Sequence, residues 1–223
     1  MSPAYAVDPL TGLLTRKAFC EKLSECLAQA RSTPAEKPLS LGFFDIDHFL
    51  NINEDFGHEG GDEVLMVVAE TLRQLVDESA ILGRYGGDEF VALFPGKVRE
   101  QAFLILERLR QALLEKSLTF ASGKSLHGIP ISAGLASFPI DGRSASELMR
   151  KADQALYRAK VDGRAQIRLA YEERMVPKTA HFTQTQLERL SRLADEHGVS
   201  EADLLREALD ELLTKYGVND IES

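Results

Sequence analysis

The sequence has little cysteine and no long apolar run. Its two cysteines, Cys20 and Cys26, lie six residues apart in one amphipathic stretch, so they face different sides of a helix. We expect both to be reduced packing residues of a cytoplasmic protein, not a disulfide or a metal pair. No apolar run approaches the roughly 18 residues of a membrane span. The N-terminal MSPAYAVDPL lacks the basic and apolar regions of a signal peptide.

Positive charge is also scarce. The 26 Lys and Arg against 35 Asp and Glu give a net charge of -9, which argues against a general binder of nucleic acid or of anionic membranes. A local basic site for phosphates remains open. The composition, 44% hydrophobic and 27% charged, is typical of a globular protein. The length fits one large domain, or a medium domain with an appendage.

Apolar periodicity predicts alternating helices and strands up to about residue 170. We expect helices over 16–31, 51–76, 97–116 and 145–161, and strands over 39–47, 81–85, 89–94 and 165–170. LTFAS (118–122) and IPISAGLASFP (129–139) are expected to pair with each other around the loop GKSLHG. The hairpins imply antiparallel pairing, so the predicted fold class is α+β, a mainly antiparallel sheet with packed helices.

The composition changes after residue 170, which divides the chain. Residues 1–170 form the first predicted domain, 171–177 a polar linker, and 178–223 a second module. In that module, Thr183 with Gln186 and Ser200 with Asp203 have the spacing of capping boxes. The pattern predicts one short extended piece followed by two helices.

Acidic residues gather at predicted strand ends. Asp45 and Asp47 close the strand 39–47, and Asp88 and Glu89 follow Gly86-Gly87 in the hairpin. If the hairpin pairs beside that strand, Asp45 and Asp88 come close together. Clustered carboxylates repel unless a cation joins them, and Mg²⁺ prefers few carboxylates plus phosphate oxygens. From these residues alone, the alternative of a glycine turn with solvated acids remains open.

A basic pair occurs much later in the chain. Lys160 and Arg164 are four residues apart at the end of a predicted helix, so both are expected to project to one side. There they would neutralise a polyphosphate that the acids do not contact. The alternative is an ordinary solvated helix face.

Five motifs together resemble a known family, the GGDEF-domain diguanylate cyclases, over about residues 8–170. They are DPLTGLLTR (8–16), FDIDHFLNIN (44–53), FGHEGGD (56–62), RYGGDEF (84–90) and ADQALYRAKVDGR (152–164). The resemblance implies a polymerase-palm-like, nucleotidyl-cyclase-like sheet. It also implies that two GTP are condensed into cyclic di-GMP with release of two pyrophosphates, by two domains that face each other and hold one GTP each.

The resemblance assigns roles to residues that match the motifs. Asp45, Asp88 and the Ile46 carbonyl would bind Mg²⁺ or Mn²⁺, two ions per active site. Asp88 would also lie near the nucleophile, and Glu89 would organise the site. The remaining matched positions belong to the substrate site. Asn53 and Asp62 would contact the guanine, Lys160 and Arg164 would contact the phosphates, and Phe49 would shape the phosphate loop.

Three single positions and one four-residue stretch depart from the family pattern. Leu50 replaces a usual lysine, which implies weaker triphosphate binding or slower turnover. Thr15 and Ala165 each replace a usual asparagine, with structural consequences. Residues 77–80 (DESA) replace the R-x-x-D of a product-inhibition site, so feedback by cyclic di-GMP at that site is not expected.

The segment 178–217 resembles a ribbon-helix-helix module, which dimerises by pairing a short strand, here around 179–183. Its leucine-rich helices present more apolar surface than about 40 residues bury alone. We therefore expect a homodimer. DNA binding is possible but not favoured, because five Lys and Arg stand against eight Asp and Glu.

Two functions remain open at this point. One is an active cyclase whose two copies are held together by the C-terminal module. The other is a regulator that senses GTP with little or no turnover and binds DNA through that module.

Overall fold

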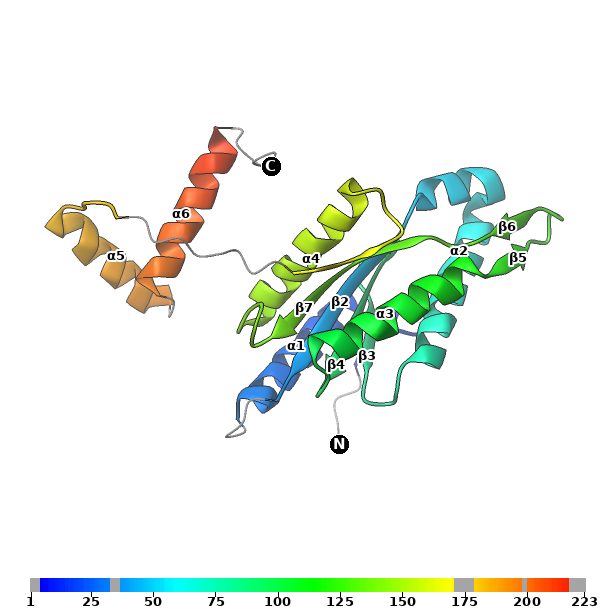
Figure 1. Ribbon diagram of the computed structural model, residues 1–223, viewed down its shortest axis with the longest axis horizontal. Helices are drawn as coiled ribbons and strands as arrows, with labels where there is room; N and C mark the ends of the chain where they lie inside the picture. The colour runs from blue at the N-terminus through cyan, green and yellow to red at the C-terminus, as the bar shows by residue number, and fades with distance from the viewer. Residues whose placement is uncertain (1–4, 33–36, 171–178, 198–199, 217–223) are drawn as a thin grey trace. The chain divides into compact units, whose positions relative to one another are not determined.

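The computed structural model describes residues 5–32, 37–170, 179–197 and 200–216 (Figure 1). The chain forms two compact units, 1–173 and 174–223, which are described separately. The predicted linker 171–177 lies outside the described residues. In the part of the chain that the structure describes, no helix has both the length and the apolarity to cross a membrane.

The first unit is built on a six-stranded sheet of order β1-β3-β4-β2-β7-β8. Its strands are β1 (Leu14–Thr15), β2 (Leu39–Ile46), β3 (Ile81–Arg84), β4 (Glu89–Pro95), β7 (Ile131–Phe138) and β8 (Ile167–Leu169). The four inner strands pair antiparallel, whereas β1 and β8 join the edges in parallel. Every residue of β2 and β7 is buried. The expected mainly antiparallel sheet is confirmed.

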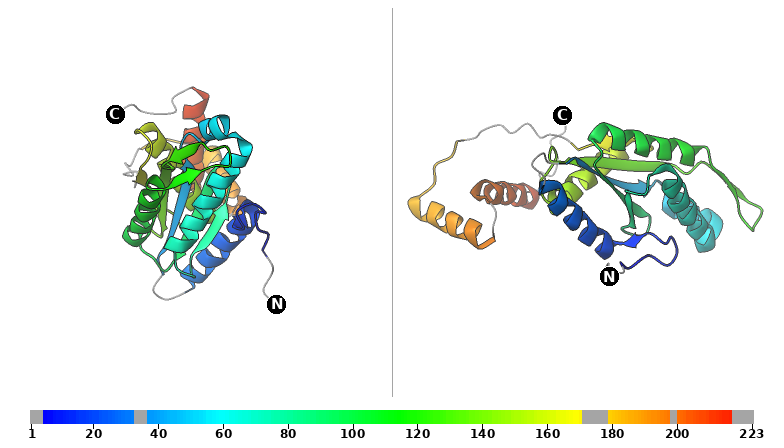
Figure 2. Two further views of the ribbon diagram at one scale, coloured as in Figure 1. Left: turned by 90° about the vertical axis from the view of Figure 1, so that its right-hand side faces the viewer. Right: turned by 90° about the horizontal axis from the view of Figure 1, so that it is seen from below.

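Helices cover both faces of this sheet (Figures 1 and 2). They are α1 (Arg16–Arg31), α2 (Phe49–Leu75), α3 (Arg99–Leu114) and α4 (Ala145–Val161). Because successive strand residues face opposite sides, the core divides in two. Phe44 packs with residues of α2 and α3, whereas Phe43 packs with residues of α1 and α4. The predicted α+β layering is therefore present.

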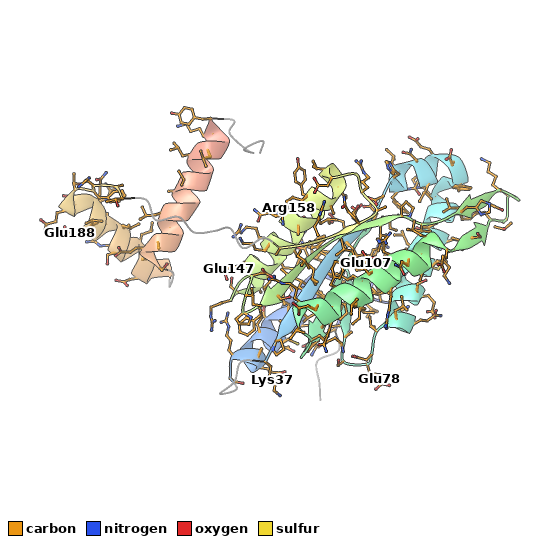
Figure 3. All side chains as sticks on the ribbon, in the orientation of Figure 1. Lys37, Glu78, Glu107, Glu147, Arg158 and Glu188 are labelled. Carbon is orange, nitrogen blue, oxygen red and sulfur yellow. The ribbon has the colours of Figure 1, made fainter. Side chains whose placement is uncertain are left out.

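The capping box predicted for the fourth helix is present. Ser144 Oγ accepts a hydrogen bond from the Glu147 amide at 3.2 Å, and Glu147 Oε2 accepts one from the Ser144 amide at 2.9 Å. Figure 3 labels Glu147 at the start of α4. This reciprocal pair satisfies two helix-end donors and fixes where α4 begins.

The pairing predicted for residues 118–139 is wrong. Strand β5 (Ser117–Thr119) pairs with β6 (Ser125–His127), which falls inside the expected loop. The two form a separate ribbon, and β7 pairs instead with β2 and β8. The physical reason is burial: β7 is buried along its whole length and needs a neighbour on each side, whereas the ribbon strands have exposed ends.

The second unit contains helices α5 (Gln184–His197) and α6 (Glu201–Lys215). The predicted Thr183 box is present: the Thr183 amide donates to Gln186 Oε1 at 2.9 Å, and the Gln186 amide donates to Thr183 Oγ1 at 3.3 Å. The side chain of Asp203 lies outside the described residues. Residues 179–183 form no strand in the described chain.

Gly134 of β7 allows α4 to pack directly on the sheet. A Cβ at Gly134 would lie 1.9 Å from the Ala152 carbonyl oxygen and 2.4 Å from the Leu156 amide nitrogen. These are backbone atoms, so α4 itself must move. We expect Gly134→Ala to lower the free energy of unfolding of this unit by about 3 kcal/mol or more, measured by urea denaturation.

Gly87→Ala is the matched control, because a Cβ there meets nothing within 4 Å. Its unfolding free energy should stay within about 0.5 kcal/mol of the wild type. Equal denaturation midpoints for wild type and Gly134→Ala would contradict the close packing.

Candidate active site

The predicted acids meet at one end of the central strands. Asp45, near the end of β2, lies opposite Glu89 of β4 on one side and Ser132 of β7 on the other. The Ile46 amide donates to the Asp88 carbonyl at 3.3 Å. The hairpin therefore pairs beside β2, and the expected proximity of Asp45 and Asp88 is found.

Negative charge is costly at this position. Burial raises the pKa of Asp45 from 3.8 to about 6, and the neighbouring Asp88 carboxylate adds to the rise while Lys160 opposes it. The pKa of Glu89 is also raised, first by burial and then by Asp88 and Asp153. Carboxylates held together away from water favour a nearby cation.

Lys160 supplies one such cation. Its Nζ lies 2.8 Å from Asp45 Oδ2, and the Asp45 side chain is only 8% exposed. The last turn of α4 carries this lysine to the end of β2, so it does not lie on a solvated helix face.

The helical spacing expected of Lys160 and Arg164 is wrong. Helix α4 ends at Val161, and the chain then turns through Gly163, with φ 109°. Arg164 (φ 62°) and Ala165 (φ 47°) adopt the left-handed conformation. Arg164 is therefore exposed in the loop after α4. The Asp162-Gly163 sequence, a common helix stop, was the signal for this ending.

Asp47 holds that loop in place, a role the sequence did not reveal. Its carboxylate accepts hydrogen bonds from Ser132 Oγ at 2.8 and 2.9 Å and from the Ala165 amide at 3.0 Å. Asp47 is 2% exposed, so these bonds compensate its burial. They connect the end of β2 to the loop that carries Arg164.

A second tether, also missed from the sequence, fixes the hairpin tip. Arg84 donates to the Gly87 carbonyl through Nε at 3.1 Å and Nη2 at 2.7 Å. Its Nη1 lies 3.3 Å from Asp8 Oδ1, and Asp8 accepts further bonds from Thr11. The sequence signal that could have indicated this tether is the presence of both motifs, since DPLTG contains Asp8 and RYGGDEF contains Arg84.

The two glycines of the hairpin have different physical roles. A Cβ at Gly86 would lie 2.3 Å from Glu89 Oε2, because the Glu89 side chain folds over this position. Around Gly87 the space is open, so a ligand can approach the backbone there.

Asn53 and Asp62 lie on either side of a break in α2. Gly57, with φ 75° and ψ 171°, interrupts the helix between them. A Cβ at Gly61 would lie 2.0 Å from Asn53 Oδ1 and 3.2 Å from Phe49 Cζ. Gly61 therefore lets the Asn53 side chain cross beside Asp62, which is exposed.

The residues at the end of β2 fit a hard divalent cation. Asp45 and Asp88 offer carboxylate oxygens, and burial raises the pKa of Asp45, so a nearby cation would favour its ionised form. Among the described residues, no three His, Cys, Asp or Glu side chains form a metal-binding group. The predicted ligand set is different, since it combines two carboxylates with the Ile46 carbonyl.

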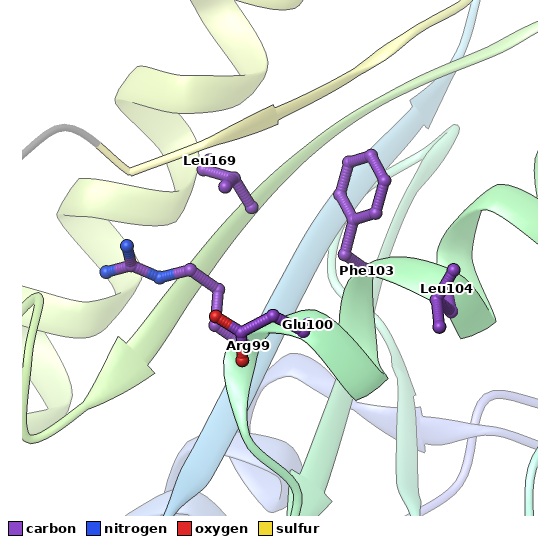
Figure 4. A pocket seen from close by; sticks show the side chains of 5 residues that line it. All are labelled: Arg99, Glu100, Phe103, Leu104 and Leu169. Atoms are coloured by element: carbon purple, nitrogen blue, oxygen red, sulfur yellow. The ribbon is translucent and has the colours of Figure 1, made fainter.

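A hollow of about 260 Å³ lies away from these residues (Figure 4). It is lined by residues of α3 and β8, namely Arg99, Glu100, Phe103, Leu104 and Leu169. None of the predicted site residues lines it.

Comparison with known proteins identifies the first unit. Residues 5–166 match the family described as "Diguanylate cyclase, GGDEF domain". The chain is 42% identical to the diguanylate cyclase DgcP of Pseudomonas aeruginosa over 73% of this chain and 24% of that protein. It is 35% identical to diguanylate cyclase A of Treponema denticola over 73% of this chain and 44% of that protein. The chain thus spans less than half of these relatives.

Solved structures agree with the fold. The GGDEF domain of DgcB from Caulobacter crescentus, solved in complex with c-di-GMP, has a TM-score of 0.71 and 32% identity, covering 77% of this chain and 97% of that one. The active GGEEF domain of a diguanylate cyclase from Vibrio cholerae has a TM-score of 0.66 and 31% identity, covering 72% and 99%. By the acids at the end of β2, by its fold and by these matches, the chain belongs to the GGDEF-domain diguanylate cyclase family.

Proposed function

We propose that the protein is a diguanylate cyclase, which condenses two GTP into cyclic di-GMP and releases two pyrophosphates. The observation that carries the proposal is the buried Asp45 beside Asp88, with Lys160 2.8 Å away. Two neighbouring carboxylates that can bind a metal ion, with a lysine beside them, are typical of a phosphoryl-transfer site. They do not fit a turn with solvated acids.

Divalent metal dependence is general in this family. We assign Asp45, Asp88 and the Ile46 carbonyl as ligands of two Mg²⁺ or Mn²⁺ ions. When bound, such ions stabilise both the attacking and the leaving oxygen. Asp88 lies at the nucleophile, and Glu89, folded over Gly86, organises the hairpin tip around it.

Lys160 and Arg164 are assigned to the phosphates. Lys160, 2.8 Å from Asp45 Oδ2, would be available to a phosphate oxygen when a metal ion is bound at the carboxylate. The N-terminus of α2, which begins at Phe49, adds amide groups and the positive end of a helix dipole. Leu50 in this first turn is 68% exposed and supplies no charge where relatives of the motif have lysine.

Asn53 and Asp62 are assigned to the guanine. The Asp62 carboxylate accepts from the N1–H and the exocyclic amino group. Adenine presents a lone pair at N1 instead, so it repels the carboxylate and leaves it unpaired. The site is therefore selective for GTP.

One domain holds one GTP, so the reaction needs two copies of the chain. Each 3′-oxygen forms a bond to the α-phosphorus of the other nucleotide, and the bond from that phosphorus to the pyrophosphate oxygen breaks. We assign dimerisation to a ribbon-helix-helix-like module over 178–223, after a linker at 171–177 and the cyclase domain over 1–170. Support comes from the apolar side chains exposed on α5 and α6: Leu187, Leu193, Leu205, Leu209, Leu212 and Leu213.

The proposed activity depends on protein concentration. With GTP and Mg²⁺, the wild type should form cyclic di-GMP and pyrophosphate at nanomolar protein, because tethering raises the effective concentration of the partner domain. Leu209→Glu, at a side chain 53% exposed on α6, should be monomeric and lose most of its specific activity at the same concentration. Chromatography of the products and light scattering measure both.

Glu188→Gln on α5, labelled in Figure 3, is the control and should match the wild type. If the wild type forms no cyclic di-GMP at any concentration and shifts a specific DNA sequence in a gel, the protein is the GTP-sensing regulator and not an active cyclase. A monomeric Leu209→Glu with full activity would remove the dimerising role from the module.

Asp45 should destabilise the metal-free protein at neutral pH. Its folded pKa is raised to about 6 from 3.8, so folding favours the protonated carboxyl and stability falls as pH rises through this interval. In EDTA at pH 8, we expect Asp45→Asn to raise the Tm by roughly 5 °C, which corresponds to a gain of about 2 kcal/mol in the free energy of unfolding. With Mg²⁺ and GTP, the same variant should form no product. The difference in Tm between Asp45→Asn and the wild type should become smaller as the pH is lowered towards 5.

Asp77→Asn is the control of opposite sign. The Lys97 ammonium, 2.6 Å away, lowers the pKa of Asp77 to about 2, so this substitution should lower the Tm at pH 8. A Tm of Asp45→Asn below that of the wild type at pH 8 would refute the assigned cost.

Leu50→Lys should strengthen substrate binding. The side chain is exposed, so lysine fits without repacking and places a charge beside the proposed phosphates. We expect the KM for GTP to fall about fivefold, because an exposed charge pair contributes about 1 kcal/mol of binding free energy. Leu50→Gln, which adds polarity without charge, should leave the KM unchanged. Equal KM values for both variants would contradict a phosphate site at this turn.

A further inference from the structure

The relative placement of Asn53 and Asp62 depends on the break in α2. The two residues belong to different helical segments, and Gly57 between them has left-handed φ with an extended ψ. Any change in the angle between the segments therefore shifts Asn53 against Asp62. A Cβ at Gly57 would meet nothing within 4 Å, and glycine has a broad range of backbone conformations, so contacts other than side-chain packing at Gly57 fix that angle.

Part of the restraint is internal to α2. A Cβ at Gly60 would lie 2.6 Å from Phe56 Cβ, so the two segments are packed against each other at this point. Phe56 is the residue immediately before the break. Its side chain stays partly exposed even in the complete unit, so α2 does not enclose it and another element can contact it.

The ribbon formed by β5 and β6 supplies that contact. The Phe120 ring lies 4.6 Å from the Phe56 ring, centroid to centroid, and its Cε1 is 3.4 Å from the position of a Cβ at Gly60. Phe120 is 6% exposed. One aromatic side chain of the ribbon therefore touches both sides of the break.

A charged residue of the ribbon, Lys124, also contacts the helix beside the break. Lys124 Nζ donates to the Asp55 carbonyl at 2.7 Å and lies 6.0 Å from the Phe56 ring centroid. Asp55 is in the last turn of the first segment, where carbonyls carry the negative end of the helix dipole. Phe120 and Lys124 face each other across the turn of the ribbon, since the Phe120 amide donates to the Lys124 carbonyl at 3.0 Å.

We propose that the tip of the β5–β6 ribbon, through Phe120 and Lys124, sets the angle of the α2 break and thereby the guanine selectivity of Asn53 and Asp62. Both are positioning residues, because neither is placed at the substrate. The inference rests on the proposed function, since it concerns the assigned base site. It gives this ribbon, which carries none of the predicted site residues, a place in substrate recognition.

The test compares GTP with inosine triphosphate, which lacks the exocyclic amino group. In the full chain, wild type should show a KM for inosine triphosphate about tenfold above that for GTP, the loss of one charge-assisted hydrogen bond. Lys124→Met, at an exposed side chain, should reduce this ratio at least about threefold with kcat within about twofold. Phe120→Leu should act in the same direction.

Two controls separate positioning from general destabilisation. Thr119→Val removes a hydroxyl that bonds Ser125 Oγ across the ribbon at 3.1 Å and should keep the wild-type ratio. Asp62→Ala should abolish the discrimination, and adding Lys124→Met to it should change the ratio no further. The shift in Tm that each nucleotide causes measures its binding, so GTP and inosine triphosphate can also be compared without turnover.

The outcomes distinguish this inference from the proposed function. A wild type that binds neither nucleotide would refute the function and the inference together. A wild type that discriminates, with Lys124→Met and Phe120→Leu keeping its full ratio, would overturn the inference alone. A lowered Tm with an unchanged ratio in these variants would likewise show that the ribbon only stabilises the fold.

Discussion

The burial of Asp45 beside Asp88 is the constraint on which the rest of the site depends. A carboxylate at the end of a fully buried strand loses its hydration, and a second carboxylate on the neighbouring hairpin repels it. The fold accepts this cost and balances it with one lysine from α4. An oxygen-rich position with raised pKa is, in turn, a suitable place for a divalent cation and a triphosphate.

Two polar tethers, one buried at Asp47 and one partly exposed at Arg84, hold the loops around this charge balance. Asp47 joins the end of β2 to the loop after α4 through Ser132 and the Ala165 amide. Arg84 joins the hairpin tip to Asp8 near the N-terminus. Each tether links segments that are distant in sequence, so loops without regular structure gain fixed positions. Asp47 looked like part of the acid cluster in the sequence, yet its hydrogen bonds give it a structural role.

Long periodic segments and paired motifs were predictable, whereas short elements and tertiary contacts were not. The helices at 16–31 and 145–161 repeat their apolar residues at helical spacing and have the predicted bounds. The three-residue strands β5 and β6 are too short to show a period. Arg164 was misplaced because helical spacing was extended past Asp162-Gly163. The contact of Lys160 with Asp45 brings together distant parts of the chain, so local pattern carries no sign of it.

The shortness of the outermost strands bears on how copies of the chain meet. Strand β1 has two residues and β8 three, so each side of the sheet offers few unpaired amide and carbonyl groups. Long free edges invite sheets to join into extended aggregates. The reaction proposed above requires two copies of the chain to face each other, and edge-to-edge pairing would compete with that encounter. By leaving little backbone to pair in its outermost strands, the fold disfavours edge-to-edge association of copies.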